Sequence, residues 1–144
     1  MSTANVIVLL RLSLFTAIEH SDALFRPRTE VQAVDWLRVH TTTADAVFAA
    51  YWTGSYIPAK AGNAVFLGQR YETSHFADKM LLLGKFFDVK TSVAWRESLL
   101  SQYHIAYVFD GPRERALGDL PENASYLQPV FSNEAVRIYR VNIP

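Results

Sequence analysis

Cysteine is absent from this chain of 144 residues. Its absence excludes disulfides, thiol nucleophiles, and zinc or iron–sulfur sites with cysteine ligands. Charge of one sign is also lacking, because 14 Lys and Arg residues balance 14 Asp and Glu residues. Without a net positive charge, no long-range field draws the chain to nucleic acid or to an anionic membrane. Nucleic acid is therefore not expected as a partner.

Several short motifs of enzyme families are missing as well. The sequence has no GxGxxG, no P-loop GxxxxGK[ST] and no HExxH. The four histidines, at positions 20, 40, 75 and 104, lack the spacing of metal ligands. No nucleophile, base and orienting group can be assembled from the sequence. We therefore expect no metal and no cofactor, and a chain that is not catalytic on its own; a small hydrolase or transferase is the least favoured function.

No apolar run is long enough to span a bilayer, which takes about 20 residues. The longest run, VIVLLRLSLFTAI at residues 6–18, contains one charge, Arg11. It lacks the basic region and cleavage site of a signal peptide. Two interpretations remain open: a buried strand or helix, or the trailing end of a membrane helix that would need lipid or a partner chain to cover it.

The rest of the chain is half apolar and predicts a sizeable core. Pro27 should end the preceding segment, and Thr29 with Gln32 matches a capping box that opens a helix running to about Val39. The apolar run AVFAAYW at residues 46–52 predicts a buried strand. A turn at residues 53–55, one or two helical turns ended by Gly62 and a short strand at residues 65–67 should follow.

Further helices and strands are predicted toward the C-terminus. Thr73 or Ser74 should cap one helix, Ser92 should open another, and IAYVF at residues 105–109 reads as a strand. Residues 126–131 and residues 136–141, which alternate between apolar and polar side chains, are predicted to pair as a hairpin. This order predicts an α/β fold: a three-layer sandwich with a small, centrally parallel sheet and a C-terminal antiparallel hairpin. We expect a single domain at residues 29–144, preceded by an apolar segment and linker at residues 1–28.

Ligands of such folds bind at the carboxyl ends of the strands. Gly54 and Ser55 follow the first strand, where they form either an ordinary turn or an anion site at a helix N-terminus. Arg70, Glu72 and His75 precede a helix: the carboxylate and imidazole could act as acid and base beside an anion-binding guanidinium, or all three could simply serve the helix end.

A third group follows IAYVF at the same edge. Asp110, Arg113 and Arg115 lie in the stretch DGPRER. Either arginine could clamp a phosphate or a carboxylate with two hydrogen bonds, or the stretch could be a turn with a solvated charged face. The sequence thus gives eight candidate ligand-binding residues: Gly54, Ser55, Arg70, Glu72, His75, Asp110, Arg113 and Arg115.

Four stretches taken in order carry a family resemblance. They are AVDWLR at residues 33–38, IPAKAG at 57–62, HIAYVFDGPRER at 104–115 and VRIYRV at 136–141. Over residues 29–141 the chain resembles the C-terminal soluble domain of polytopic bacterial membrane glycosyltransferases of the GT-C class, which includes protein mannosyltransferases and relatives of oligosaccharyltransferase.

This resemblance implies a location and a role. It places the domain after a last membrane helix, on the extracytoplasmic side, with residues 6–18 as the end of that helix or as its contact with the missing transmembrane portion. The catalytic carboxylates of that class lie in membrane loops absent from this chain, and Gln69 stands where similar sequences have histidine, so no catalytic residue is carried over. A lipid-linked sugar or an acceptor is the implied ligand.

Two functions of different classes follow. The first is a non-catalytic soluble domain of a membrane glycosyltransferase-like protein that contributes to acceptor, ligand or partner binding at the membrane surface. The alternative is a free-standing small α/β binding module for a phosphorylated or sugar ligand, which could form a homo-oligomer sealed by its apolar N-terminus.

Overall fold

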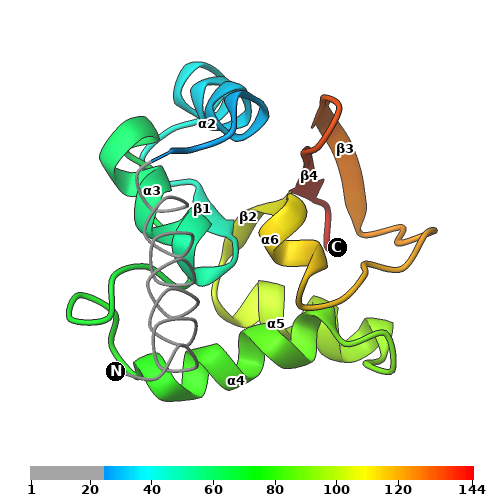
Figure 1. Cartoon of the computed structure of the whole chain (residues 1–144). Coiled ribbons are helices and arrows are strands. Elements are labelled where there is room, and N and C mark those ends of the chain that lie inside the picture. Colours follow the sequence, from blue (N-terminus) through cyan, green and yellow to red (C-terminus); the bar gives the residue numbers. More distant parts are fainter. Residues whose placement is uncertain (1–24) are drawn as a thin grey trace, which may run out of the picture.

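The computed structural model describes residues 25–144. The predictions for residues 6–18 lie outside the described residues. Figure 1 shows helices and strands in mixed order along the chain. They are α2 (Arg28–His40), β1 (Ala46–Phe48), α3 (Tyr51–Ala61), α4 (Phe76–Phe87), α5 (Val93–Gln102), β2 (Ile105–Asp110), α6 (Pro112–Arg115), β3 (Leu127–Ser132) and β4 (Arg137–Val141).

The four strands form one mixed sheet in the order β1-β2-β4-β3. β1 runs parallel to β2, whereas β4 is antiparallel to both β2 and β3. Val108 in β2 pairs with Phe48 on one side and with Tyr139 on the other. The α/β fold predicted from the sequence, with its parallel pair and C-terminal hairpin, is confirmed.

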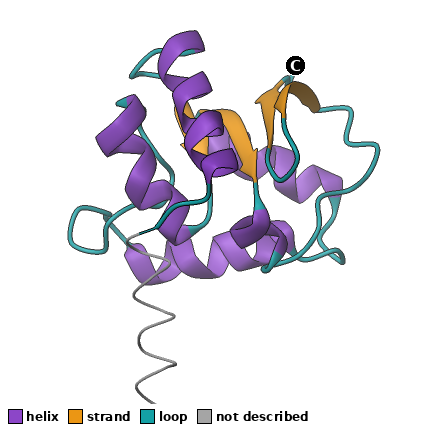
Figure 2. Cartoon of the chain, turned by 45° about the horizontal axis from the view of Figure 1, so that its top comes forward, coloured by secondary structure: helices purple, strands orange, loops and turns teal. Residues whose placement is uncertain are grey.

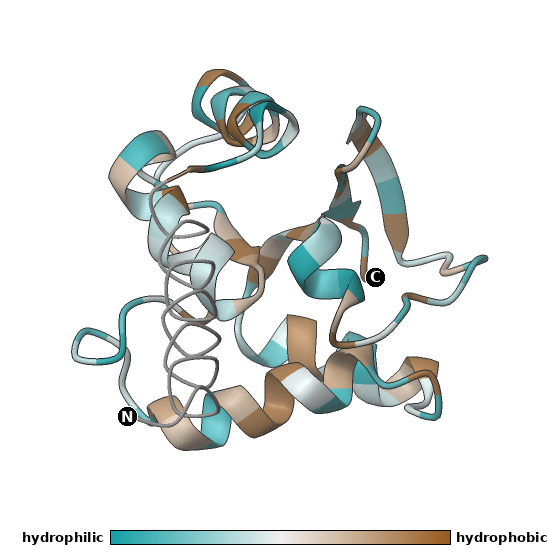
Figure 3. Ribbon diagram, in the orientation of Figure 1, coloured by the Kyte–Doolittle hydropathy of each residue, from teal (hydrophilic) through white to brown (hydrophobic). Residues whose placement is uncertain are grey.

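Helices cover both faces of this sheet (Figures 1 and 2). Alternate residues of β2 point to opposite faces, so Tyr107 and Phe109 join one apolar cluster and Val108 joins the other. α2 and α3 complete the first cluster, and α4 and α5 complete the second. Figure 3 shows this apolar interior as brown on β2 and on the middle of α4. The sheet lies between two apolar clusters, each covered by helices, and this arrangement gives the three predicted layers.

β1 is shorter than predicted. The strand ends at Phe48, and the second half of the run AVFAAYW enters α3, which begins at Tyr51. A continuous apolar run fits a buried helix as well as a buried strand, so periodicity alone could not divide it. Gly54 and Ser55 therefore lie inside a helix rather than in the expected turn. This helix ends at Gly62, in the left-handed conformation with φ 81°, as predicted.

The expected strand at residues 65–67 is reduced to a single bridge. Val65 pairs with Val47 in parallel, and Phe66 donates its backbone N–H to the Val47 carbonyl at 3.0 Å. The segment then turns away at Gly68. Its close approach to α3 depends on Gly54, where an added Cβ would lie 1.9 Å from the Leu67 carbonyl oxygen.

Two predicted helix caps are wrong and one is confirmed. Thr29 lies within α2, because Pro27 already takes the N-cap position without a side-chain hydrogen bond. His75, with φ 54°, takes the N-cap of α4. Thr73 instead accepts the backbone N–H of Gly68 at 3.1 Å, which closes the loop between them. Ser92 caps α5 as predicted.

Candidate functional site

The carboxyl ends of β1 and β2 are joined by one buried carboxylate. Glu114 on α6 is fully buried, and its Oε1 accepts the Ala50 N–H at 2.9 Å while its Oε2 accepts the Gly111 N–H at 3.0 Å. Ala50 precedes α3 and Gly111 follows β2. Glu114 therefore fixes the start of α3 beside the end of β2.

Burial raises the pKa of Glu114, against the opposing effect of the hydrogen bonds from the Ala50 and Gly111 backbone. Sequence analysis missed this residue because Ala50 lies 64 positions away. The stretch DGPRER ends in three adjacent charged residues, 113–115, and no local pattern indicates which of their side chains is buried.

Arg113 turns toward a second buried carboxylate. Its Nε lies 3.6 Å from Oε2 of Glu30 on α2, and only 4% of Glu30 is exposed. Arg26 binds Oε1 of Glu30 and donates to the Trp52 carbonyl oxygen at 2.7 Å. Arg113 thus contributes to an ion-pair cluster that ties α2 to the sheet edge. The sequence suggested that Arg113 clamps an anion of a bound ligand. In the structure its guanidinium already lies against the Glu30 carboxylate.

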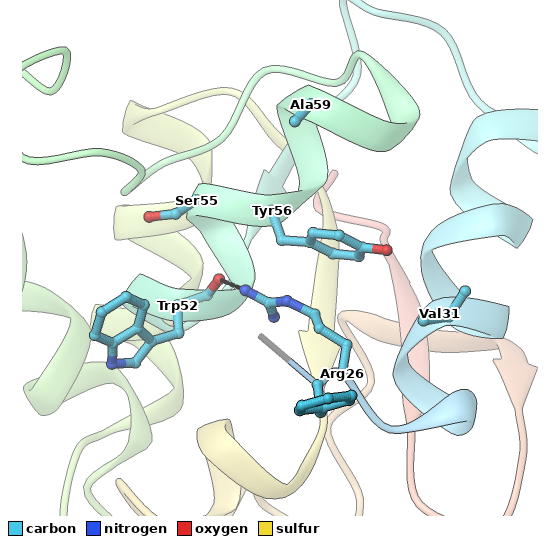
Figure 4. Close-up of a pocket in the computed structure, with 7 residues that line it drawn as sticks. Arg26, Val31, Trp52, Ser55, Tyr56 and Ala59 are labelled. Carbon is cyan, nitrogen blue, oxygen red and sulfur yellow. Dashed lines mark hydrogen bonds between the residues drawn. The ribbon is translucent and has the colours of Figure 1, made fainter. Parts of the chain in front are cut away.

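A hollow of about 480 Å³, here called the tryptophan hollow, lies beside this cluster (Figure 4). The Arg26 guanidinium lies 4.3 Å from the centre of the Tyr56 ring, so the arginine is held by an aromatic face as well as by hydrogen bonds. Half of Trp52 is exposed. The lining residues are Phe25, Arg26, Val31, Trp52, Ser55, Tyr56 and Ala59.

A second hollow of about 530 Å³, the loop hollow, lies next to the tryptophan hollow, with Ser55 and Ala59 of α3 lining both. It brings together three of the predicted residues, Gly54, Ser55 and Glu72. Its other lining residues are Pro58, Ala59, Val65, Phe66, Gly68, Gln69, Thr73, Ser74 and Lys79.

Arg70 and His75 lie on the same loop but do not line the loop hollow. The Arg70 guanidinium lies 6.0 Å from the centre of the Phe76 ring. The His75 Nδ1 lies 4.0 Å from an Asp78 carboxylate oxygen, and both side chains are exposed. Glu72 lines the loop hollow whereas Arg70 and His75 do not, so the structure does not bring these three residues together in one hollow.

Asp110 and Arg115 line a third hollow of about 840 Å³, the hairpin hollow, between the loop after α6 and the β3–β4 hairpin. Arg115 contacts the Asp110 carboxylate at 3.4 Å and binds the Ala135 carbonyl oxygen. Burial raises the pKa of Asp110, although Arg115 and Arg137 act in the opposite direction. The eight predicted residues are therefore distributed over α3, the loop before α4, and the end of β2 with α6.

Lys79 is a polar residue of the loop hollow that the sequence analysis did not select. Its Nζ lies 5.3 Å from the centre of the Phe66 ring and 5.6 Å from that of Tyr103. The sequence analysis predicted this helix from its cap residues, which carry no signal for a charged side chain on the helix itself.

Over residues 25–144, no helix has the length and apolar character needed to cross a membrane. The same stretch contains no group of three His, Asp or Glu side chains placed to hold a metal ion.

No family model matches the chain, and no curated protein matches it at a significant level. The fold is similar to the crystal structure of the C-terminal globular domain of oligosaccharyltransferase from Archaeoglobus fulgidus, with a TM-score of 0.59. The match covers 82% of this chain and 100% of that domain, at 13% sequence identity. At this identity the likeness establishes a shared fold.

Proposed function

We propose that this chain is a non-catalytic domain of a membrane glycosyltransferase-like protein, and that it helps to bind an acceptor, a ligand or a partner at the extracytoplasmic membrane surface. The observation that carries the proposal is the fold: the match extends over the whole of the archaeal oligosaccharyltransferase domain. Residues 29–144 would form the binding domain, and residues 1–28 would connect it to the membrane or to a transmembrane portion.

The edge of the sheet next to α3 supports a binding role. The tryptophan hollow and the loop hollow share Ser55 and Ala59, so one surface offers exposed Trp52 on one side and polar groups such as Glu72 on the other. Small-ligand sites combine an apolar wall with a few placed polar groups. A lipid-linked sugar or an acceptor has both kinds of surface.

The alternative is a free-standing α/β module that binds a phosphorylated or sugar ligand, alone or as a homo-oligomer. The same two hollows favour it. The two functions differ in where the chain is found in the cell.

Membrane fractionation of cells that express the chain from its own gene tests the proposal. We expect the chain in the membrane fraction after an alkaline carbonate wash, because the apolar run at residues 6–18 or a transmembrane portion would hold it there. Deletion of residues 1–20 should release it into the supernatant with an unchanged melting temperature if that run is its only attachment.

Recovery of the full chain in the supernatant would contradict the proposal and favour the free-standing module. Aggregation of the shortened chain would show that residues 6–18 belong to the core, and the interpretation of this run as a membrane segment would be wrong.

A further inference from the structure

Lys79 presents a cation to the loop hollow and is in no ion pair with the residues that the structure describes. Its ammonium is held near the Phe66 and Tyr103 rings at distances typical of cation–π contacts. Within residues 25–144 none of the ion pairs involves Lys79. An ammonium has three N–H donors and no acceptor. These donors remain for a ligand in the hollow.

Neutral donors lie in the same hollow. The Thr73 hydroxyl oxygen accepts the Gly68 N–H, so its own hydrogen is left to donate to another group. The Ser74 hydroxyl and the Gln69 side-chain amide have no hydrogen-bond partner among the described residues, and both line the hollow. The wall near the start of α4 is therefore rich in donors.

The hollow also contains acceptors. The Ser55 hydroxyl donates to the Tyr51 carbonyl at 2.8 Å, which leaves its oxygen as an acceptor. Glu72 supplies the single carboxylate of the lining, and it is exposed. Lys79 and Glu72 together make the hollow neutral, so a bare anion would gain little from long-range attraction. A ligand with an anionic end and hydroxyl groups would use both charges.

We infer that the loop hollow binds a phosphorylated sugar or similar polyol, with the phosphate on Lys79, Thr73 and Ser74 and a ligand hydroxyl donating to Glu72. Phosphate oxygens accept several hydrogen bonds at once and bind most strongly to charged donors. A volume of about 530 Å³ fits a ligand of this size. The inference rests on the proposed ligand-binding function of the domain and names the chemical class of its ligand.

A nuclear magnetic resonance titration of the nitrogen-labelled full chain tests it, with inorganic phosphate, a hexose phosphate and the unphosphorylated hexose as probes. Both phosphate probes should shift the backbone amides of residues 68–79, the hexose phosphate at lower concentration, and the hexose alone should not. Lys79→Gln should weaken hexose phosphate binding about tenfold or more, because a charge-assisted hydrogen bond is lost.

Lys85→Gln is the matched control. Lys85 also lies on α4 with its ammonium near an aromatic ring, 4.4 Å from the centre of Trp95, but it does not line the loop hollow. Its replacement should change the affinity by less than about twofold. Ser74→Ala, at an exposed position whose hydroxyl has no hydrogen bond to the described residues, gives a second readout if Lys79→Gln fails to fold, and should weaken binding about threefold or more.

Three results would overturn the inference: no amide shift with either phosphate probe, equal losses in Lys79→Gln and Lys85→Gln, or equal binding of the hexose and its phosphate. Equal affinity for inorganic phosphate and the hexose phosphate would remove the role of Glu72. Fractionation reports on membrane attachment and the titration reports on the ligand, so either proposal can fail while the other stands.

Discussion

Gly54 lies where α3 meets the backbone of the segment that ends at Gly68. An added Cβ would come within 1.9 Å of the Leu67 carbonyl oxygen, a distance that no rotamer change can relieve because the neighbour is backbone. The chain must therefore have glycine here for packing, whatever its role in ligand binding. The packing requirement at Gly54 is therefore independent of any role that this residue has in lining the loop hollow.

Gly54→Ala should lower the free energy of unfolding by about 1–3 kcal/mol, because the segment of Leu67 must move away from α3. Gly84→Ala is the control: it also lies in a helix, and an added Cβ would meet nothing within 4 Å. There the loss of backbone entropy in the unfolded chain should raise stability by about 0.5–1 kcal/mol. Urea denaturation of both variants measures the contrast; equal effects would contradict the packing account.

The protonation of Glu114, also a single residue, makes the stability of the fold depend on pH. Burial raises its pKa in the folded chain, so the folded chain binds this proton more tightly than the unfolded chain does. The contribution of Glu114 to the free energy of unfolding is therefore greatest at acid pH and falls as pH rises from the ordinary carboxyl range through the raised pKa. Burial also raises the pKa of Asp110, so its contribution to the free energy of unfolding changes with pH in the same direction.

Glu114→Gln should destabilise the fold by about 1–3 kcal/mol at about pH 5, because an amide can accept only one of the two N–H groups through its oxygen and leaves the other unsatisfied. The difference in the free energy of unfolding between this variant and the wild type, here called the gap, should narrow toward about pH 8, where only the wild type bears a buried charge. Denaturation at both pH values measures the gap, and Glu122→Gln, at an exposed position, should show none. A gap that widens with pH would contradict the account.

At the scale of elements, the end of α4 depends on a buried arginine. Arg96 of α5 is 2% exposed, and it donates to the Phe86 carbonyl at 2.7 Å and to the Asp88 carbonyl at 2.6 Å. Carbonyls at a helix C-terminus lack partners within the helix, and a cation there also meets the negative end of the helix dipole. Arg96 thus joins α4 to α5.

Arg96→Leu should lower the free energy of unfolding by about 3 kcal/mol, because the buried Phe86 carbonyl and the partly buried Asp88 carbonyl lose a charged donor. Arg38→Leu provides the comparison: Arg38 lies exposed on α2, 3.5 Å from Asp35, and its loss should cost less than about 1 kcal/mol. Chemical denaturation of the two variants compares them. Similar losses would show that the bonds of Arg96 add little to the helix junction.

The elements show what sequence patterns can predict. Ser92 as a helix cap and the alternation of residues 136–141 are local signals, and the structure has α5 and β4 there. The run AVFAAYW has no local signal that divides it, because a continuous apolar run fits a buried helix as well as a buried strand. Thr29 carries the cap pattern, but Pro27 starts the helix earlier.

The candidate site was less predictable than the fold, since it depends on contacts between distant segments. Sequence reasoning located the sheet edge and selected Glu72 and Ser55, which the loop hollow brings together. It could not foresee that Arg113 would face Glu30, or that Lys79 would be held by Phe66 and Tyr103. Such pairings are set by tertiary packing and leave no periodic trace.

At the scale of the whole molecule, the sheet order β1-β2-β4-β3 places the hairpin at one edge and the hollows beside α3 at the other. Figure 1 shows β3 and β4 on the side of the molecule away from α3. The tryptophan hollow and the loop hollow thus lie at the edge next to β1, and the hairpin hollow lies at the other. The proposed function, together with the family resemblance of the sequence, leads to the hypothesis that the chain works at the extracytoplasmic membrane surface.

Single-cysteine labelling tests this claim most directly, because these 144 residues contain no cysteine and give no background of their own. Tyr71→Cys places a thiol at a position that is 98% exposed, and Ala49→Cys, at a buried position, is the negative control. A membrane-impermeant maleimide should label Tyr71→Cys in intact cells as fully as in lysed cells, and should not label Ala49→Cys in either. Labelling of Tyr71→Cys only after lysis would contradict the account.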